Sequence, residues 1–118
     1  MSITYLDLNI TNTQDEKKAK KVRFLVDSGA IYSVLPKALL KSLGIKKLDT
    51  QEFMLANGKS LTKDVGAALF EFNGKKRPSP VVFGEKDIYL LGAVTLESLE
   101  VALDPINRQL LPLPMLLM

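Results

Sequence analysis

The hydrophobic pattern of the first 26 residues predicts a pair of strands. Residues 3–10, with the sequence ITYLDLNI, alternate between apolar and polar side chains, which is typical of a half-buried strand. Residues 22–26 form a second strand-like run after the polar segment 11–21, which contains the basic stretch KKAKK. We therefore expect a hairpin with a long, basic and solvated tip.

Two later segments predict short helices. In PKALLKSLG, residues 36–44, Pro36 lies near the first helical turn and Gly44 lies just past the last one. In TLESLE, residues 95–100, we expect one or two helical turns with Thr95 as the N-cap.

The remaining apolar segments predict strands. Asn57-Gly58 and Asn73-Gly74 each lie between strand-like runs, and this dipeptide is the strongest short-range signal for a hairpin. Residues 88–94, IYLLGAV, predict a buried strand that ends at Gly92, and VALD and QLLPLPMLLM predict two closing strands. The pattern as a whole predicts a mainly β fold, a small closed or folded β-barrel with one or two short helices.

The length of the chain limits its organisation. With 118 residues, it is long enough for one domain with a core and short for two. We expect a single domain over residues 1–118, with a core of about residues 3–112 and a C-terminal tail at 113–118. In the segment PLPMLLM, residues 112–118, Pro112 and Pro114 argue against a central strand.

The composition excludes several kinds of chemistry. The sequence has neither Cys nor His, so disulfides, thiolate nucleophiles, Ser-His-Asp triads and Cys- or His-based metal sites are all ruled out. Acid–base chemistry must come from carboxylates, Lys or Tyr, and we expect no cofactor and no metal. The net charge of +3 does not by itself indicate nucleic acid.

The termini give no sign of a targeting or membrane segment. The first eight residues lack the apolar core of a signal peptide, and the apolar run LLPLPMLLM is too short to span a bilayer. We expect a cytoplasmic protein without a membrane partner.

The segment FLVDSGA places an acid directly after an apolar strand. Phe24, Leu25 and Val26 are predicted to be buried on both faces of that strand, so Asp27 emerges from a packed core. The following Ser28-Gly29-Ala30 supplies a hydroxyl, a flexible backbone and a small side chain. Taken alone, Asp-Ser-Gly is better explained as a solvated turn, because all three residue types favour turns.

Three motifs in order change that interpretation. FLVDSGA, then LANGK, then LLGAVTLESL together resemble the retropepsin-type aspartic proteases, the family of retroviral proteases and their stand-alone prokaryotic relatives. The resemblance extends over about residues 3–112, and LGAVTLESLEVALDPINRQLLP resembles the C-terminal half of the small prokaryotic members.

The resemblance implies a role for each residue of the first motif. Asp27 would be a catalytic aspartate, and the hydroxyl of Ser28 would link the two aspartate loops of a dimer. Gly29 and Ala30 would line the substrate cleft.

The resemblance also assigns the other two motifs. Ala56, Asn57 and Gly58 would form the tip of a flap that closes over substrate. Leu90, Leu91 and Gly92 would pack behind the aspartate loop, with Gly92 permitting a close approach of backbones, and the C-terminal strand would enter a dimer interface.

The number of catalytic motifs predicts the assembly. The mechanism of the family needs two carboxylates that share a proton, yet Asp-Ser/Thr-Gly occurs only once in the sequence, at residues 27–29. The chain would therefore work as a two-fold homodimer with the site on its axis. We expect an aspartic endopeptidase that hydrolyses an extended peptide or protein substrate.

Two alternatives remain at this point. One is a non-catalytic dimeric module that binds peptides on the same fold. The other is a nucleic-acid binder using the tip 17–21, which is disfavoured because no aromatic side chain is interleaved with the lysines. We expect no nucleic-acid partner.

Overall fold

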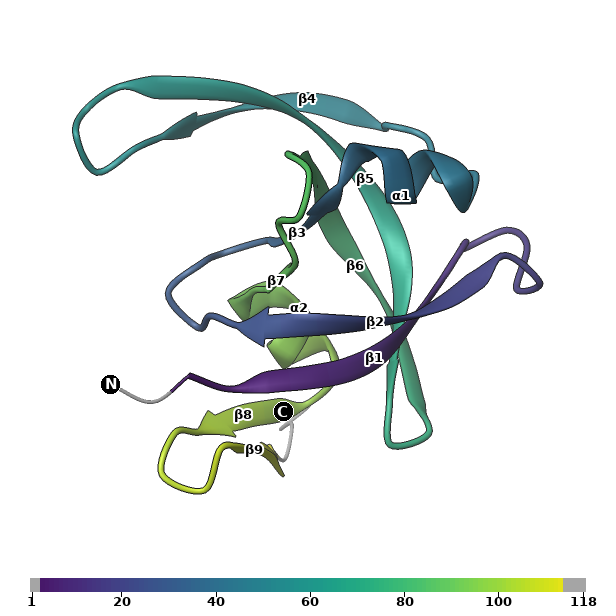
Figure 1. Cartoon of the computed structure of the whole chain (residues 1–118), viewed down its shortest axis with the longest axis vertical. Coiled ribbons are helices and arrows are strands. Elements are labelled where there is room, and N and C mark those ends of the chain that lie inside the picture. The colour runs from purple at the N-terminus through teal and green to yellow at the C-terminus, as the bar shows by residue number, and fades with distance from the viewer. Residues whose placement is uncertain (1–2, 114–118) are drawn as a thin grey trace, which may run out of the picture.

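A computed structural model of the chain describes residues 3–113, and over that range it contains nine strands and two short helices (Figure 1). In chain order they are β1 (Tyr5–Thr11), β2 (Ala19–Val26), β3 (Ser33–Pro36), α1 (Lys37–Ser42), β4 (Asp49–Met54), β5 (Ser60–Phe72), β6 (Lys75–Gly84), β7 (Leu90–Leu91), α2 (Ala93–Ser98), β8 (Val101–Asp104) and β9 (Gln109–Pro112).

Seven of the strands form one sheet that closes on itself. Their order is β1-β2-β7-β3-β6-β5-β4, and β1 also pairs with β5 through residues 9–11 and 69–71. Six strands therefore make a closed ring, and β4 is attached to the outside of that ring through β5 alone. The predicted mainly β fold with a small closed barrel and two short helices is confirmed.

The core fills the inside of the ring. The rings of Phe24 on β2 and Phe70 on β5 lie 6.0 Å apart at its centre, and both side chains are fully buried. Leu8 and Ile10 on β1 are buried too, whereas Tyr5 is exposed, so the alternation in the sequence separates the inner face of β1 from its outer face. The helices add Leu40 and Leu96 to the same cluster.

Strand β5 is part of both the β4–β5 hairpin and the closed ring. Its first six residues pair with β4, and its second half pairs with β6 inside the ring. A side chain at Gly66, next to the changeover, would come within 2.8 Å of the carbonyl oxygen of Lys46, so glycine is required for the strand to pass there. The β4–β5 hairpin, which we call the flap hairpin, arches away from the barrel as a result (Figure 1).

Both predicted Asn-Gly hairpins are present, with different turns. Asn73 and Gly74 both have positive φ angles, 50° and 78°, as the tight β5–β6 turn demands. At the tip of the flap hairpin only Gly58 has a positive φ, 85°, and its N–H donates to the carbonyl oxygen of Leu55 at 2.9 Å. The tip of the flap hairpin is therefore a longer loop than the β5–β6 turn, and its turn needs a positive φ at Gly58 alone.

The two helices occur where the sequence placed them, with one correction. Helix α1 begins after Pro36 and ends before Gly44, whose φ of 72° is the left-handed conformation expected past a helix end. Helix α2 begins two residues earlier than predicted, and its N-cap is Gly92. The prediction that Thr95 caps this helix is wrong, since Thr95 is fully buried within it. No helix in residues 3–113 is long and apolar enough to cross a membrane.

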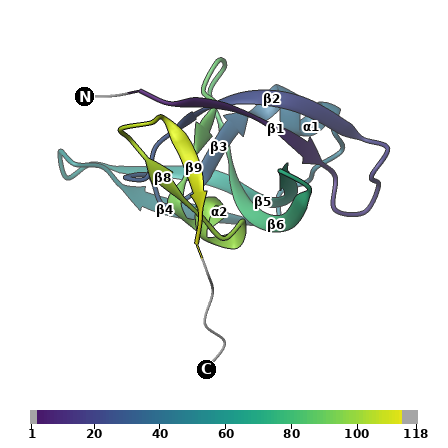
Figure 2. The same cartoon turned by 90° about the horizontal axis from the view of Figure 1, so that it is seen from below.

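Three further details differ from the sequence prediction. Strand β3 was not anticipated, and the strand predicted over residues 88–94 is reduced to β7, with Ile88 exposed. Leu25 is half-buried rather than buried, because it lies on the outer face of β2. The two C-terminal strands are present, but they pair with each other as a separate sheet beside α2, nearest the viewer in Figure 2. The tail predicted beyond residue 113 lies outside the described residues.

Candidate active site

Asp27 stands at the end of a strand that is anchored in the barrel. Its own N–H donates to the carbonyl oxygen of Leu91 at 3.0 Å, continuing the parallel pairing of β2 with β7. The preceding Val26 is buried, whereas Asp27 is exposed. The strand thus carries the carboxylate from the core to the surface in one residue.

The turn after Asp27 fixes the direction of its carboxylate. The N–H of Gly29 donates to Oδ1 of Asp27 at 3.0 Å, and the N–H of Ala30 donates to the Asp27 carbonyl oxygen at 3.1 Å. The Ser28 side chain is exposed, and within residues 3–113 its hydroxyl has no hydrogen-bond partner. Residues 27–30, which we call the aspartate loop, therefore present an oriented carboxylate and a free hydroxyl on the same side of the barrel.

The chain after the aspartate loop is tied to the start of α2. The N–H of Ala93 donates to the carbonyl oxygen of Ala30 at 2.8 Å, and the N–H of Val94 donates to that of Ile31 at 3.0 Å. A side chain at Gly92 would come within 2.5 Å of the Tyr32 carbonyl carbon. Gly92 is thus required for the two segments to lie this close.

Three buried hydroxyls hold α2 and the start of β3 together behind the aspartate loop. Thr95 Oγ1 on α2 lies 2.6 Å from Ser33 Oγ on β3 and 2.8 Å from Ser79 Oγ on β6. Ser33 Oγ also accepts the N–H of Gly92 at 3.0 Å. This hydroxyl cluster of Ser33, Ser79 and Thr95 was missed from the sequence, because its members are far apart in the chain.

An apolar pocket of about 300 Å³ begins at Ala30, the last residue of the aspartate loop. It lies between residues 30–34 and the flap hairpin, and Tyr32 meets Phe53 of β4 edge to face at 6.1 Å. Its lining residues are Ala30, Ile31, Tyr32, Val34, Phe53, Leu61, Lys63 and Val82. Only Ala30 was predicted as a site residue, although the apolar run after DSGA was a usable signal.

One ion pair lies at this pocket. Lys63 Nζ is 2.6 Å from Oε1 of Glu85, and this hydrogen bond holds the pKa of the Glu85 carboxyl below its ordinary value. Lys63 belongs to the flap hairpin and Glu85 follows β6, so the pair joins the hairpin to the barrel.

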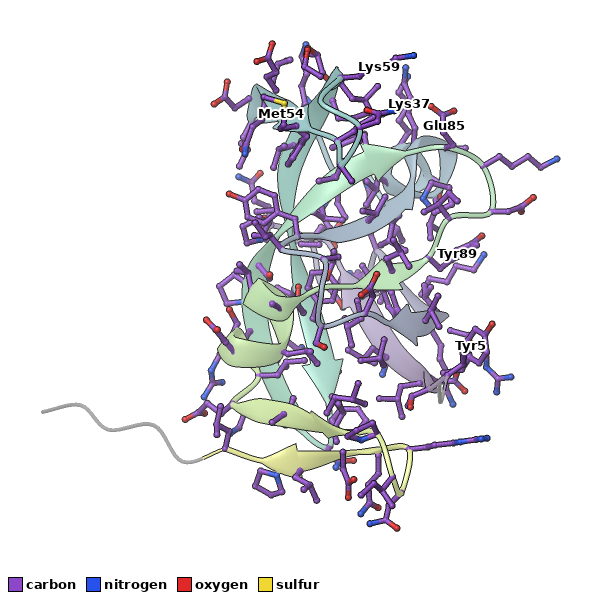
Figure 3. All side chains as sticks on the ribbon, turned by 90° about the vertical axis from the view of Figure 1, so that its left-hand side faces the viewer. Tyr5, Lys37, Met54, Lys59, Glu85 and Tyr89 are labelled. Atoms are coloured by element: carbon purple, nitrogen blue, oxygen red, sulfur yellow. The ribbon has the colours of Figure 1, made fainter. Side chains whose placement is uncertain are left out.

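A second pocket, of about 260 Å³, lies on the other side of β2. Leu25, two residues before Asp27, contributes to it, as do Tyr5 and Tyr89, which lie on the same side of the molecule in Figure 3. This second pocket is less apolar than the first, because Arg23 and Asp87 are among its lining residues.

The predicted flap residues at the tip of the hairpin lie on the same side of the barrel as the aspartate loop and form no hydrogen bond with it in the part of the chain that the structure describes. Both the tip of the flap hairpin and the β2–β3 connection project to the left in Figure 1, and Met54 and Lys59 mark the two sides of the tip in Figure 3. Ala56, Asn57 and Gly58 are exposed, and within residues 3–113 no hydrogen bond joins them to residues 27–30. The flap hairpin instead contacts the chain just after the aspartate loop, through Phe53 and Tyr32.

The described residues hold no group of three or more acidic side chains close enough to bind a metal ion. The aspartate loop itself carries the Asp27 carboxylate, the Ser28 hydroxyl and backbone groups.

Comparison with known proteins agrees with this arrangement. The sequence matches the aspartyl protease family over residues 11–102, which is most of the chain, so the chain belongs to that family. Within it, the fold is that of the retropepsins. Comparison with curated proteins gives no significant match.

Solved structures of retroviral proteases share the fold. The solution structure of the simian foamy virus (mac) protease is 23% identical, with a TM-score of 0.57, over 80% of this chain and 92% of that chain. The EIAV protease, in complex with the inhibitor HBY-793, is 17% identical, with a TM-score of 0.65, over 82% of this chain and 88% of that one.

Proposed function

We propose that this protein is an aspartic endopeptidase that works as a homodimer and hydrolyses peptide bonds with a water activated by two Asp27 carboxylates. The observation that carries the proposal is the position of Asp27, exposed at the end of a core strand and oriented by Gly29, beside an apolar pocket under the flap hairpin. A solvated turn would need neither the pocket nor the two backbone ties to α2.

The homodimer follows from the chemistry. One carboxylate must be ionised to take a proton from water, while the other must be protonated to polarise the scissile carbonyl. The chain supplies one such acid, so the second must come from an identical chain across a two-fold axis. The unpartnered Ser28 hydroxyl is available to bond with the second copy.

The other proposed site residues act by position. Leu91 accepts the N–H of Asp27, and Gly92 allows the Ala30–Ala93 hydrogen bond to form behind the loop. Gly29 orients the carboxylate, and Ala56, Asn57 and Gly58 at the tip of the flap hairpin would close over an extended peptide.

A digest of a peptide library tests the proposal. The unmodified protein is compared with Asp27→Asn, which keeps the shape of the side chain and removes the titrating group from both halves of the dimer. We expect cleavage by the unmodified protein to be greatest at acidic to mildly acidic pH, in a series from about pH 4 to about pH 8, because one carboxyl must be protonated. Asp27→Asn should lose about 10²- to 10⁴-fold in rate, the usual contribution of a general acid–base group.

The matched control is Asp15→Asn in the β1–β2 loop, where the amide oxygen can still accept the N–H of Lys17. It should cleave at the unmodified rate. Equal cleavage by the Asp27→Asn variant would refute Asp27 as the catalytic group.

Sedimentation of the same samples tests the assembly. We expect dimers for both the unmodified protein and Asp27→Asn, since removing two acids that would repel each other across the dimer axis does not weaken the contact between the two copies. An active monomer would contradict the proposal. A dimer that binds peptides but cleaves none would identify a non-catalytic peptide-binding module.

A further inference from the structure

The 300 Å³ pocket beside the aspartate loop contains a single charged group, and the charge of that group bears on which peptides the proposed protease would bind. This inference rests on the proposed function, because the pocket matters only if a peptide lies across Asp27. Its first lining residue, Ala30, is three positions after Asp27, and its opposite wall is the flap hairpin. A peptide held between them would direct one side chain into the pocket.

The walls favour apolar atoms. Seven of the eight lining residues carry apolar or aromatic side chains, and the edge-to-face contact of Tyr32 with Phe53 closes the side of the hairpin. The eighth residue is Lys63, on β5 two positions after Leu61, which places both side chains on the same face of the strand. The Lys63 side chain is only 22% exposed, so much of its stem is covered.

The partner of Lys63 is easily replaced. Glu85 is 78% exposed and approaches the ammonium from solvent, at the end of β6. An exposed ion pair contributes little to stability, since water screens the attraction and both long side chains lose freedom. A carboxylate delivered from inside the pocket could therefore take the place of Glu85 at Lys63. Lys37, whose charge also acts on Glu85, adds to the positive potential there.

A substrate lysine would meet the opposite situation. Its stem would fit the apolar walls, but its ammonium would reach the like charge of Lys63, whose acidic partner Glu85 is already paired. Like charges brought together in a partly dry pocket repel strongly. Glutamate and lysine both carry a charged group on an unbranched aliphatic stem, which is shorter in glutamate, so the effect of charge is measured by how removing the Lys63 charge changes the ratio between them.

We propose that Lys63 makes this pocket selective for a substrate side chain with an apolar stem and a terminal carboxylate, that is, for glutamate over lysine at one position of the peptide. Leucine binds there through its apolar contacts alone, independently of Lys63. A hydrogen bond to a charged group is strong enough to give at least about a tenfold preference for glutamate over lysine.

The test measures binding separately from cleavage. The Asp27→Asn protein is titrated with fluorescent peptides in which Glu, Leu or Lys is placed at each position in turn, and affinity is read from fluorescence anisotropy. One position should prefer Glu over Lys at least about tenfold. Adding Lys63→Met, which keeps the stem and removes the charge, should reduce that preference to less than about twofold with no change for Leu.

Lys47→Met is the matched control, because Lys47 pairs with Asp64 and lies outside this pocket. It removes the same charge and should leave the preference intact. Glu85→Gln gives an independent measurement on a folded protein, since it removes the competitor for Lys63 and should tighten the binding of the Glu peptide alone.

The outcomes separate the inference from the proposed function. Cleavage of Leu peptides by the unmodified protein, with no effect of Lys63→Met on the Glu-to-Lys ratio, would overturn the inference and retain the endopeptidase. A preference that depends on Lys63 without any cleavage would retain the inference and remove the catalytic step. Equal effects of Lys63→Met and Lys47→Met would show a general charge effect and overturn the inference, as would the absence of peptide binding.

Discussion

At the scale of single residues, Gly92 and Thr95 hold the aspartate loop in place although neither touches substrate in the proposed mechanism. Gly92 provides space, because the Tyr32 backbone fills the volume that a Cβ would need. Thr95 provides hydrogen bonds, because it joins two serines from strands on either side. Substitution of Gly92 should therefore destabilise the protein by overpacking, and substitution of Thr95 by leaving buried hydroxyls without a partner.

Gly92→Ala should destabilise the protein by about 1–3 kcal/mol, as overpacking a rigid interior does. The nearest atoms are the Tyr32 carbonyl carbon and oxygen, 2.5 and 2.6 Å from the added Cβ, so backbone and not a flexible side chain must move. The urea midpoint and the rate of peptide cleavage should both fall.

Gly74→Ala is the control for that substitution. Its φ of 78° imposes strain of about 1–2 kcal/mol, but nothing lies within 4 Å of its Cβ position. Stability should fall while cleavage by the folded protein stays unchanged. A Gly92→Ala protein with full stability and activity would contradict the close packing described here.

Thr95→Val should cost about 1–3 kcal/mol, because it keeps the shape of the side chain and leaves the buried Ser33 and Ser79 hydroxyls without their shared partner. Thr95→Ser retains the hydroxyl and loses one methyl group, so its cost should be smaller. Urea unfolding of the two variants makes the comparison. A larger loss for Thr95→Ser would mean that packing of the methyl group, and not hydrogen bonding, is the main contribution of Thr95.

At the scale of elements, the two Asn-Gly hairpins have the same dipeptide and different backbones. Asn73 has a φ of 50°, which alanine adopts only with strain, whereas Asn57 has no positive φ and contributes a side-chain hydrogen bond to the N–H of Lys59. The dipeptide therefore predicted where the chain turns, and it did not predict which turn forms.

Asn73→Ala should consequently destabilise the protein more than Asn57→Ala, with a cost of about 1 kcal/mol. Loss of the exposed Asn57 hydrogen bond should cost less. Thermal unfolding of both variants measures the difference. The reverse order would indicate that the flap hairpin contributes more to the folded barrel than its position outside the ring implies.

The elements that the sequence predicted are those determined by local pattern. Alternation predicted β1, and Pro36 and Gly44 bounded α1, because these signals lie within a few residues of each other. Strand β3 and the N-terminus of α2 were missed or misplaced, because both depend on contacts between residues about 60 positions apart, such as Ser33 with Gly92. The pocket was missed for the same reason, since its walls come from β3, β4, β5 and β6.

At the scale of the whole molecule, Glu100 joins the end of α2 to the barrel. Its carboxylate accepts hydrogen bonds from Lys75 at 2.6 Å and Arg77 at 3.4 Å, both on β6. The hydrogen bond from Lys75 is the main reason that the pKa of Glu100 lies below its ordinary value. A lowered pKa in the folded protein means that the folded state holds the ionised form more favourably than the unfolded state does.

This contribution should therefore be present above the ordinary glutamate pKa of about 4.3 and should disappear as the pH falls through the lower folded value. Glu100→Gln should unfold at a lower temperature than the unmodified protein near neutral pH, and the difference should shrink in more acidic buffer. A difference that is constant across pH would show that Glu100 acts through packing and not through its charge.

The closed ring also has a consequence for solubility. Among the seven strands of the main sheet, β4 is the one with a neighbour on a single side, so its outer row of backbone groups is open to other chains. Open edges of this kind template aggregation, and charged side chains along them oppose it. Asp49 and Glu52 lie exposed on β4, which gives this edge negative charge in a protein whose net charge is +3. Replacing both by threonine, which favours strands, should make the protein precipitate at lower concentration, and light scattering would register it before any loss of fold.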